Sequence, residues 1–482
     1  MVRGFTRRFR PLEILTEEEI EGIHRAALDV LRETGVTFEN ERALNLFEQN
    51  DCIVDYEEKR VRLPPGLVEE CIRQAPSTYR LRARDPKNDL SIGMDRIYFG
   101  LAPGQNTVDL DTWEGRVATK QEYRDFVTVL DYLDTMGWLI CYPYFGWEGV
   151  DPVMAMVEIT AGMIRDSTKV VEIGYQLDSE VFCIEMAHAV GIEILCPIAA
   201  SPPLTYYSDA CEMAFRSVEA GFPIDLCSGG VHGGTAPATI AGAIVSDTVE
   251  KLAGLALVQL IRPGTPVVAM DQTTPQNMQT GSPFFGAIGC SLHMVAETQL
   301  WRRYGIPHRN SQAGYTNSKR IDFQNGYERA ICAQNTALCG ASMLSLIGGV
   351  YGEVTAHPVQ AILDHDIAGM IGRFLEGVTV NDETLAVDVI NEVGPIPGFY
   401  LGQAHTRKWW KQEQFVPEVS DTLTYAEWME SGRKSCLDYA QEKLERILDT
   451  HRPTPLTPGQ EEDIQRIVEE ARQHYTKKGL ME

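Results

Sequence analysis

The sequence predicts an α/β fold, a (β/α)8 TIM barrel with an N-terminal α+β cap and C-terminal helices. Three observations support this prediction. Short apolar runs that end in small or polar residues alternate with helical segments, which is typical of parallel strands joined by helices. At least six such units follow one another along the chain. No GxGxxG motif follows the first strand, so a doubly wound dinucleotide-binding sheet is disfavoured.

We expect three segments, namely the cap over residues 1–94, the barrel core over 95–398 and a helical extension over 399–482. The cap begins with an amphipathic helix, because Thr16 and Glu19 form a capping box ahead of apolar residues at helical spacing, and Gly35 ends it. A short-strand region and a second helix near Pro65 to Gln74 follow. We expect this cap to be architectural.

Each expected strand of the core is a short run that a parallel sheet would bury. The six runs are TMGWLICYPYF, STKVVEIGY, GIEILCPIAAS, AGFPIDLCSGG, PGTPVVAMDQTT and YGIPHRNSQAG. Two long helical connections are expected, PATIAGAIVSDTVEKLAGLALVQLIRPG and FQNGYERAICAQNTALCGASMLSLIGG. The glycine pairs Gly229–Gly230 and Gly233–Gly234 are interpreted as tight turns, and no Walker motif is present. In the extension, Thr457 and Pro458 have the pattern of a helix start.

Composition excludes several classes of protein. The formal net charge is −25, which repels nucleic acid and anionic membrane surfaces. The N-terminal residues lack the apolar run of a secretory signal, and no apolar run reaches the length of a membrane span, so we expect a cytoplasmic protein. The eleven cysteines show no CxxC and no paired Cys/His spacing. We therefore expect reduced, buried thiols and no metal or tightly bound cofactor.

Chemistry in such a barrel belongs at the carboxyl ends of the strands. Those ends carry no HxH, no lysine placed for a Schiff base, no acid pair and no GxSxG elbow. They carry aromatic residues instead, namely Tyr98, Phe99, Tyr142, Tyr144, Phe145, Tyr206, Tyr207, Phe284, Phe285 and Tyr351. Aromatic faces attract a quaternary ammonium by about 0.5 to 2 kcal/mol each. The pattern favours recognition of a cation, although any single ring can be a packing residue.

Three runs carry a resemblance to a known family. They are GGTAPATIAGAIVSDTVEKLAGLALVQLIRPGTPVV, RYGIPHRNSQAGYTNSKRIDFQNGYERA and LDHDIAGMIGRFLEGVTVNDETLAVDVINEVGP, the last followed by GFYLGQAHT. With them the chain resembles the trimethylamine methyltransferase superfamily of corrinoid-dependent enzymes. The resemblance implies methylamine metabolism of the kind found in methanogenesis, in which a TIM barrel delivers a substrate methyl group to the cobalt of a separate corrinoid (cobalamin) protein.

The same resemblance identifies the substrate class. It aligns Tyr351, within SLIGGVYGEVTAHP, with the position at which the trimethylamine enzymes carry pyrrolysine. Members without pyrrolysine resemble enzymes for quaternary amines, so we expect glycine betaine or a related betaine as methyl donor. A quaternary ammonium leaves as a neutral amine and needs no acid or base. We therefore expect no catalytic side chain beyond those that position the substrate.

Candidate substrate-binding residues follow from this reading. Besides Tyr351, the rings of Tyr98, Tyr142, Tyr144, Tyr206 and Phe284 are candidates for the ammonium group. A betaine carboxylate needs donors, and His308, Arg309, Asn310, Gln312, His357 and Gln272 are candidates, with His357 and Asn310 favoured. Capping of a turn before Pro358 is the alternative for His357, and anchoring of the loop is the alternative for Glu353.

Two other functions stay open. A zinc-dependent methyltransferase barrel would need three Cys, His or acidic ligands at strand ends. A non-catalytic quaternary-amine-binding protein would keep the fold and the ligand without turnover. The expected partners are a cognate corrinoid protein and the small amine, and we expect a homo-oligomer, in which the C-terminal helices either form contacts or are simply solvated.

Overall fold

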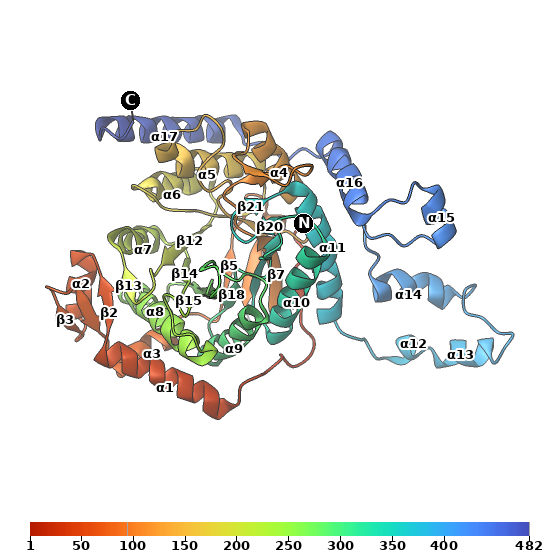
Figure 1. The fold of residues 1–482 in the computed structure, drawn as a ribbon, viewed down its shortest axis with the longest axis horizontal. Coiled ribbons are helices and arrows are strands. Elements are labelled where there is room, and N and C mark those ends of the chain that lie inside the picture. The colour runs from red at the N-terminus through yellow and green to blue at the C-terminus, as the bar shows by residue number, and fades with distance from the viewer. Residues whose placement is uncertain (94, 482) are drawn as a thin grey trace.

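A computed structural model describes residues 1–93 and 95–481 of the chain. Its centre is a curled sheet of parallel strands surrounded by helices (Figure 1). The strands in spatial order are β10 (Trp138–Leu139), β11 (Val170–Glu172), β12 (Ile194–Ala199), β14 (Ile224–Ser228), β16 (Val267–Asp271), β18 (His308–Asn310), β19 (Met343–Ile347) and β7 (Arg96–Leu101). A parallel bridge between Phe99 and Met136 brings β7 back towards β10.

One helix follows each strand of the curled sheet. These helices are α4 (Lys120–Tyr132), α5 (Ala155–Asp166), α6 (Ser179–Val190), α7 (Ser208–Ala220), α8 (Ile240–Ile261), α9 (Ile288–Tyr304), α10 (Phe323–Cys339) and α11 (Pro358–Leu375). The α/β prediction is confirmed, and all six expected runs contain a parallel strand of this sheet. Among the described residues, none of the helices is both long and apolar enough to cross a membrane.

The predicted helix FQNGYERAICAQNTALCGASMLSLIGG is wrong in its second half. Helix α10 ends at Cys339 because Gly340 takes a left-handed conformation with φ of 97°. The next apolar run, Met343–Ile347, is the fully buried strand β19, paired with β18 and β7. A strand buried on both faces has no alternating pattern, so its sequence resembles a buried helix.

Short elements join the main layers at their edges. They are β8 (Thr107–Val108), β9 (Gly115–Arg116), β13 (Thr205–Tyr206), β15 (Val231–His232), β17 (Thr274–Pro275), β20 (Gly349–Tyr351), β21 (Thr355–Ala356) and the 3-10 turns η1 (Pro86–Asn88) and η2 (Pro152–Met154). All of these except η1 lie in the segments that follow the carboxyl ends of the central strands.

The N-terminal residues pack directly against the central layers. Their elements are β1 (Phe5–Thr6), α1 (Glu17–Glu33), β2 (Val36–Phe38), α2 (Glu41–Glu48), β3 (Ile53–Asp55), β4 (Arg60–Arg62), α3 (Pro65–Gln74), β5 (Thr78–Leu81) and β6 (Leu90–Gly93). The capping box of Thr16 and Glu19 forms as predicted. Strands β1 and β6 pair with β7, β2 pairs with β13, and α1 and α3 pack on α8.

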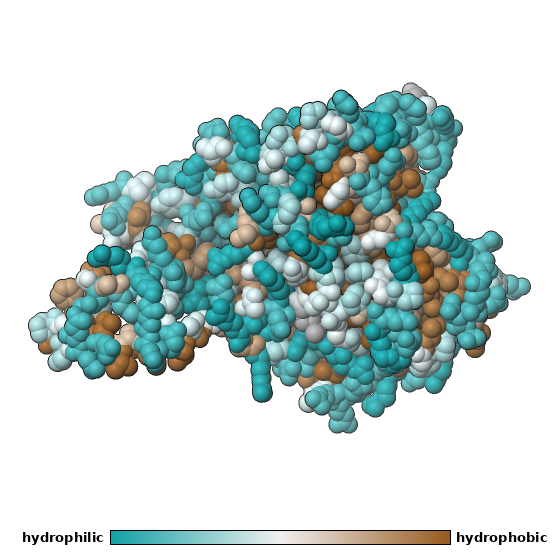
Figure 2. Space-filling view, turned by 180° about the vertical axis from the view of Figure 1, so that it is seen from behind, coloured by the Kyte–Doolittle hydropathy of each residue, from teal (hydrophilic) through white to brown (hydrophobic). Residues whose placement is uncertain are grey.

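The C-terminal residues form an arm and two returning helices. The arm, residues 376–435, carries α12 (Asp382–Leu385), α13 (Val387–Val393), α14 (Ala404–Gln414) and α15 (Tyr425–Glu430) and projects from the body, with brown apolar side chains at the left of Figure 2. Helix α16 (Cys436–Thr450) packs on α11 and α4, and α17 (Pro458–Lys477) packs on α6 and α5. The predicted start of α17 at Thr457 and Pro458 is confirmed.

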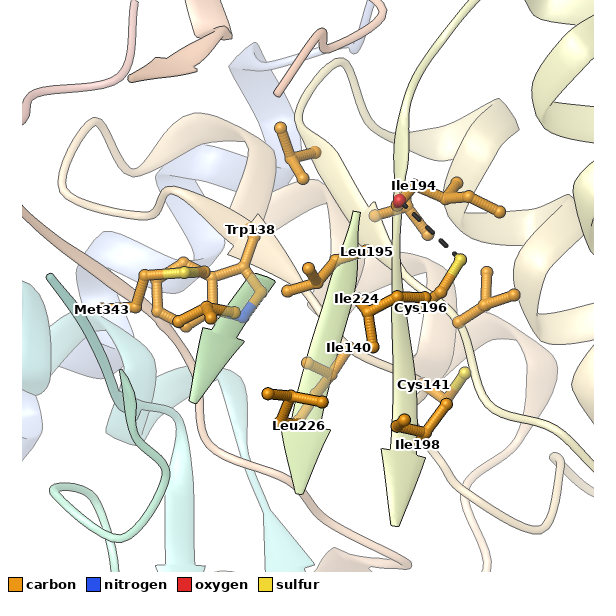
Figure 3. Packing of buried hydrophobic residues seen from close by; sticks show 14 of the residues in the cluster. Trp138, Ile140, Cys141, Ile194, Leu195, Cys196, Ile198, Ile224, Leu226 and Met343 are labelled. Carbon is orange, nitrogen blue, oxygen red and sulfur yellow. Dashed lines mark hydrogen bonds between the residues drawn. The ribbon is translucent and has the colours of Figure 1, made fainter. Parts of the chain in front are cut away.

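The inside of the curled sheet combines apolar packing with one buried ionic cluster. Figure 3 shows buried apolar side chains on both faces of the sheet, among them Trp138 of β10 and Met343 of β19. In the same interior, Arg309 of β18 donates to Glu172 of β11 at 2.5 Å and to Asp225 of β14. Burial raises the pKa of both carboxyl groups, that of Glu172 to about 7, while Arg309 opposes the shift.

The contact between α11 and β1 gives a test of the packing. A methyl group on Gly372 would overlap the ring of Phe5, which is fully buried. We predict that Gly372→Ala lowers the free energy of unfolding by about 1 to 3 kcal/mol. Gly326→Ala on α10 is the matched control, because its added methyl meets open space, and it should be neutral or stabilising by up to about 1 kcal/mol. Thermal and denaturant unfolding of both variants measure this, and equal effects would contradict the packing.

Candidate functional site

A cavity of about 350 Å³ opens at the carboxyl ends of the central strands. Its walls come from the segments that follow β12, β14, β16, β18 and β20, with one further loop between β17 and α9. The lining residues are Ala199, Ala200, Ser201, Pro202, Cys227, Ser228, Gly229, Val231, Gln272, Thr274, Pro283, Phe285, Gln312, Tyr315 and Glu353. Larger hollows, of 710, 650 and 460 Å³, lie beside α11, between α2 and α8, and beside the start of α17, and no described residue of the central strands lines them. In parallel α/β folds the strand ends are where ligands bind, so the smaller cavity is the candidate site.

The lining combines one acid, two rings and unpaired polar atoms. Partial burial raises the pKa of the Glu353 carboxyl, whose side chain is exposed to the cavity. The rings of Phe285 and Tyr315 meet edge to face, with centroids 5.2 Å apart. The Tyr315 hydroxyl and the Oε1 atom of Gln312 are buried and have no hydrogen-bond partner among the described residues. None of the lining residues that the structure describes is Lys, Arg or His.

A second buried guanidinium holds the loops around the cavity. Arg329 of α10 donates to the carbonyl oxygens of Gly314, Leu346 and Gly349 and pairs with Asp364 of α11. Asp364 also accepts from the backbone N–H of Gly348 at 2.8 Å. These bonds tie the segment after β18 to the glycine-rich segment after β19.

Two glycines of SLIGGVYGEV, Gly348 and Gly352, stand where a side chain would overlap a neighbouring ring. Gly348 has a φ of 90°, and a side chain there would meet Phe126. Gly352 has a φ of 49°, and a side chain there would meet Phe285, whose ring lines the cavity. The chain therefore turns back against the cavity wall only where side chains are absent. This turn places Glu353 at the cavity.

Glu328 of α10 connects the two loops whose rings, Phe285 and Tyr315, line the cavity. One oxygen of Glu328 accepts from the Thr316 hydroxyl at 2.5 Å and from the Asn317 backbone at 2.9 Å. The Asn317 amide in turn donates to the carbonyl oxygen of Phe285. This chain of contacts fixes the loop that carries Phe285 relative to the loop that carries Tyr315.

Of the predicted substrate-binding residues, Gln272 and Gln312 line the cavity. They are linked directly, since the Gln312 amide donates to the carbonyl oxygen of Gln272. Tyr144 and Phe284 lie on loops beyond strand ends and are 39% and 43% exposed. Tyr144 and Phe284 are not part of the lining of the cavity.

Other predicted residues have structural partners outside the cavity. Tyr206 stacks on Phe38 with centroids 5.1 Å apart and donates to the carbonyl oxygen of Glu250. Tyr142 donates to the carbonyl oxygen of Ala356 at 3.3 Å.

Tyr98 and Asn310 also make structural contacts. Tyr98 accepts from the backbone of Ser91 at 3.2 Å. Asn310 donates to the hydroxyl of Thr336 on α10 at 2.7 Å, and its side-chain oxygen accepts from the Gln312 backbone at 2.8 Å. Asn310 therefore orients Gln312 from behind the cavity wall.

Tyr351 and His357 also lie outside the lining. The ring of Tyr351 meets that of Phe285 edge to face at 6.3 Å, and the Lys319 ammonium covers it at 4.5 Å from its centroid. His357 is the N-cap of α11, where its Nδ1 atom accepts from the backbone N–H of Val359 at 3.1 Å. The structure thus gives His357 the capping contact that was the alternative reading of this residue.

Four residues that line the cavity are not among the predicted substrate-binding residues, namely Ser228, Phe285, Tyr315 and Glu353. Phe285 stood among the strand-end aromatics, and Glu353 was considered as a loop anchor. Tyr315 lies five residues beyond the end of β18, in the same segment as Gln312. The rule that ligands bind beyond parallel strand ends was the signal available for all four.

A separate group of potential metal ligands lies behind the cavity wall. Asp247, Asp271, His293 and Glu297 are buried, and one ligand atom from each lies within 4.8 Å of the others. Helical spacing of four residues links Asp247 to Lys251 and His293 to Glu297, which is a signal that the sequence contains. Only the fold adds Asp271, from the end of β16.

Comparisons with known proteins agree on one family. The sequence model of the family described as "Trimethylamine methyltransferase (MTTB)" matches residues 1–476. The chain is 30% identical over 476 residues to the trimethylamine methyltransferase MttB of Desulfitobacterium hafniense, covering 95% of this chain and 94% of the relative. It is 30% identical over 471 residues to a glycine betaine methyltransferase of the same species, covering 94% and 96%.

A solved structure is similar in fold. The monomethylamine methyltransferase MtmB of Methanosarcina barkeri superposes with a TM-score of 0.54 at 12% sequence identity. The match covers 97% of this chain and 89% of the other. At this identity the likeness concerns the fold alone.

The capping contact of His357 makes stability depend on pH. Burial lowers the pKa of His357 to about 4, against about 6.5 in an unfolded chain, so the folded protein resists protonation. Stability from this group is complete above pH 6.5 and is lost as the pH falls towards 4. The variant His357→Asn keeps a capping acceptor but has no imidazole to protonate. We predict that its free energy of unfolding falls by about 2 kcal/mol less than that of wild type between pH 7.5 and 4.5. Urea unfolding at several pH values measures this, and parallel curves would contradict it.

Proposed function

The chain belongs to the trimethylamine methyltransferase family, and from this premise we propose that it moves a methyl group from a quaternary amine to a corrinoid protein. The donor is glycine betaine or a related betaine, the acceptor is the Co(I) of a partner corrinoid protein, and the tertiary amine is released. The observation that carries the proposal is the composition of the cavity, where Glu353 stands with Phe285 and Tyr315 and the described lining has no basic side chain.

The proposal includes a closed (β/α)8 barrel. It is supported by eight parallel strands whose spatial order follows their chain order, by the helix after each of them and by the Phe99–Met136 bridge. On this view residues 95–398 form the catalytic core, and residues 1–94 and 399–482 are its cap and extension.

The ammonium group is placed by charge and by aromatic faces. A carboxylate beside a quaternary ammonium supplies Coulomb attraction, and each ring face adds about 0.5 to 2 kcal/mol. A quaternary nitrogen has no N–H, so it does not use the hydrogen-bond acceptors that a tertiary ammonium would. Glu353, Phe285 and Tyr315 provide attraction without demanding a donor from the substrate.

The carboxylate of a betaine is placed by neutral donors. The Tyr315 hydroxyl has no partner among the described residues, and the Gln272 amide lines the same wall. Burial raises the pKa of Tyr315 well above its ordinary value, so the hydroxyl keeps its proton for donation. Arg309 is not assigned this role, because its guanidinium already donates to Glu172 and Asp225.

Transfer from a quaternary amine moves no proton. The C–N bond breaks and its electron pair stays on nitrogen, which leaves as a neutral amine. The partner's corrinoid supplies the nucleophile that accepts the methyl group. This chain holds the donor so that one N-methyl faces the open end of the cavity, and such positioning supplies roughly 7 to 11 kcal/mol in favourable cases. Because the positive charge disappears in the transition state, a moderate attraction is better than a strong one.

The surroundings of the cavity fit a large, partly apolar partner group. Exposed aromatic and apolar side chains stand on loops beyond the strand ends, at Tyr144, Phe145, Tyr207, Met278 and Phe284. Exposed residues of these types are enriched where proteins dock. We propose that these loops receive the corrinoid domain of the partner.

The choice of methyl donor is tested with purified protein and reduced cobalamin under anaerobic conditions. We predict that a quaternary amine, tested as glycine betaine, carnitine and choline, methylates Co(I) about tenfold faster or more than trimethylamine. The change in the visible spectrum of cobalamin reports the rate. Equal rates for trimethylamine and the best quaternary amine would overturn the substrate class. Binding of a quaternary amine without methylation of cobalamin or of any corrinoid partner would favour the non-catalytic alternative.

The role of Glu353 is tested by charge removal. We predict that Glu353→Gln raises KM for the best quaternary amine about tenfold and changes kcat much less, because the carboxylate attracts the substrate before the methyl leaves. Glu462→Gln on the exposed face of α17 is the matched control and should leave both constants unchanged. A Glu353→Gln variant with wild-type KM would contradict the placement of the cation.

A further inference from the structure

We propose that Asp247, Asp271, His293 and Glu297 bind one divalent metal ion behind the cavity wall, as a structural ion. The residues come from three elements that the fold brings together, since Asp247 lies on α8, Asp271 ends β16, and His293 and Glu297 lie one turn apart on α9. All four are at most 2% exposed. None of them lines the cavity, so the ion would be enclosed by protein.

The distances between the ligand atoms suit coordination better than hydrogen bonding. The Nε2 atom of His293 lies 3.5 Å from Asp271 Oδ2, 3.6 Å from Glu297 Oε2 and 3.7 Å from Asp247 Oδ2. These separations exceed ordinary N–H···O distances of about 2.7 to 3.2 Å. In a tetrahedron with metal bonds of about 2.1 Å, ligand atoms stand about 3.4 Å apart.

Several buried polar atoms of the cluster have no hydrogen-bond partner among the described residues. They include Asp271 Oδ2, His293 Nε2 and Glu297 Oε2. The same holds for His308 Nε2, which lies 3.6 Å from Glu297 Oε2 and is aimed into the cluster from β18. Each such atom costs about 1 to 3 kcal/mol when nothing satisfies it. One cation satisfies several of them at once.

The buried cluster contains more negative than positive side chains, which favours binding of a cation. Asp247, Asp271 and Glu297 are three carboxylates, and Lys251 is the one ammonium among the described residues that pairs with them, 2.7 Å from Asp247 and also paired with Glu297. With neutral imidazoles, three negative charges against one positive charge leave two uncompensated in the interior. Burial of uncompensated charge is strongly unfavourable, and a divalent ion removes the imbalance.

A neighbouring histidine orients the proposed nitrogen ligand. His232 Nε2 lies 3.2 Å from His293 Nδ1. When Nδ1 of His293 donates to His232, the lone pair of His293 Nε2 faces the carboxylates, which is the tautomer a metal requires. Nothing but a cation or a proton stabilises a lone pair aimed at three carboxylates.

The ligand chemistry selects the kind of metal. Three carboxylate oxygens with one imidazole nitrogen, and no thiolate, suit Zn²⁺, Mn²⁺ or Fe²⁺ rather than Cu⁺. Four protein ligands would fill a tetrahedral shell, whereas catalytic zinc has three protein ligands and a water molecule. The sequence has none of the Cys and His spacings that commonly predict metal sites, and this set is mainly carboxylate.

The proposed ion would stabilise the strand ends that carry the cavity wall. Asp271 Oδ1 accepts from the Thr273 backbone at 2.7 Å, and the Asp271 carbonyl accepts from the Ser311 hydroxyl at 2.6 Å. These bonds flank Gln272 and Gln312, which line the cavity. Fixing the Asp271 carboxylate would therefore hold the loops after β16 and β18 in register.

Elemental analysis of the full-length protein is the first test. We expect about one equivalent of Zn²⁺, Mn²⁺ or Fe²⁺ per chain after purification without chelator or affinity metal. After removal of metal with a chelator, the midpoint of thermal unfolding should fall and should return on addition of Zn²⁺ or Mn²⁺. Loading the stripped protein with Co²⁺ should produce the visible absorption of a four-coordinate N/O site. These readouts do not depend on methyl transfer, so they can fail while the proposed function stands.

Variants distinguish a metal site from a cluster balanced by protons alone. Asp271→Asn and His293→Gln should each lose most of the bound metal and the thermal response to it, whereas the control His357→Asn should keep both. Metal content below about 0.1 equivalent in wild type, with no rise in the unfolding midpoint on adding Zn²⁺, Mn²⁺ or Fe²⁺, would overturn the proposal. If the variants do not fold, the wild-type measurements alone decide it.

Discussion

The buried guanidinium of Arg309 is the interaction on which the centre of this structure depends. It lies inside the curled sheet and joins four other strands, through Glu172 of β11, Asp225 of β14, Ser345 of β19 and the ring of Trp138 on β10 at 5.3 Å. Removing one member of a buried ion pair generally costs about 3 to 5 kcal/mol, because the other charge stays unpaired. Because these contacts use the guanidinium inside the sheet, Arg309 is not available to a ligand, although its position at a strand end makes it a candidate.

A second buried guanidinium, that of Arg329, holds the loops around the cavity in place. Arg329 binds three carbonyl oxygens and Asp364, so the loops after β18 and β19 are fixed to α10 and α11 rather than left mobile. Binding sites are accurate when the groups behind them have their own partners. Asn310 plays the same part for Gln312, which lines the cavity, while Asn310 itself is not part of the lining.

Charge is distributed unevenly around the cavity. The chain has a net charge of −25, and the described cavity wall contains Glu353 without a basic side chain. Both features favour a cationic ligand, the first by raising its concentration near the surface and the second by local attraction. Asp247, Asp271 and Glu297 beneath the wall add three buried carboxyl groups to this region.

The sequence by itself determined the layers of this protein, and the tertiary structure decided which side chains meet. Helix caps and apolar runs are local, so the helix after Thr16 and six central strands were predictable, and Gln272 and Gln312 followed from the strand-end rule. Strand β19 was missed because a run buried on both faces has no period. Neighbouring strand residues point to opposite faces, so only the folded sheet placed Gln312 in the cavity and Asn310 behind it. Glu353 follows a strand end and His293 and Glu297 have helical spacing, but only contacts between distant segments place Glu353 in the cavity wall and bring Asp271 to the cluster.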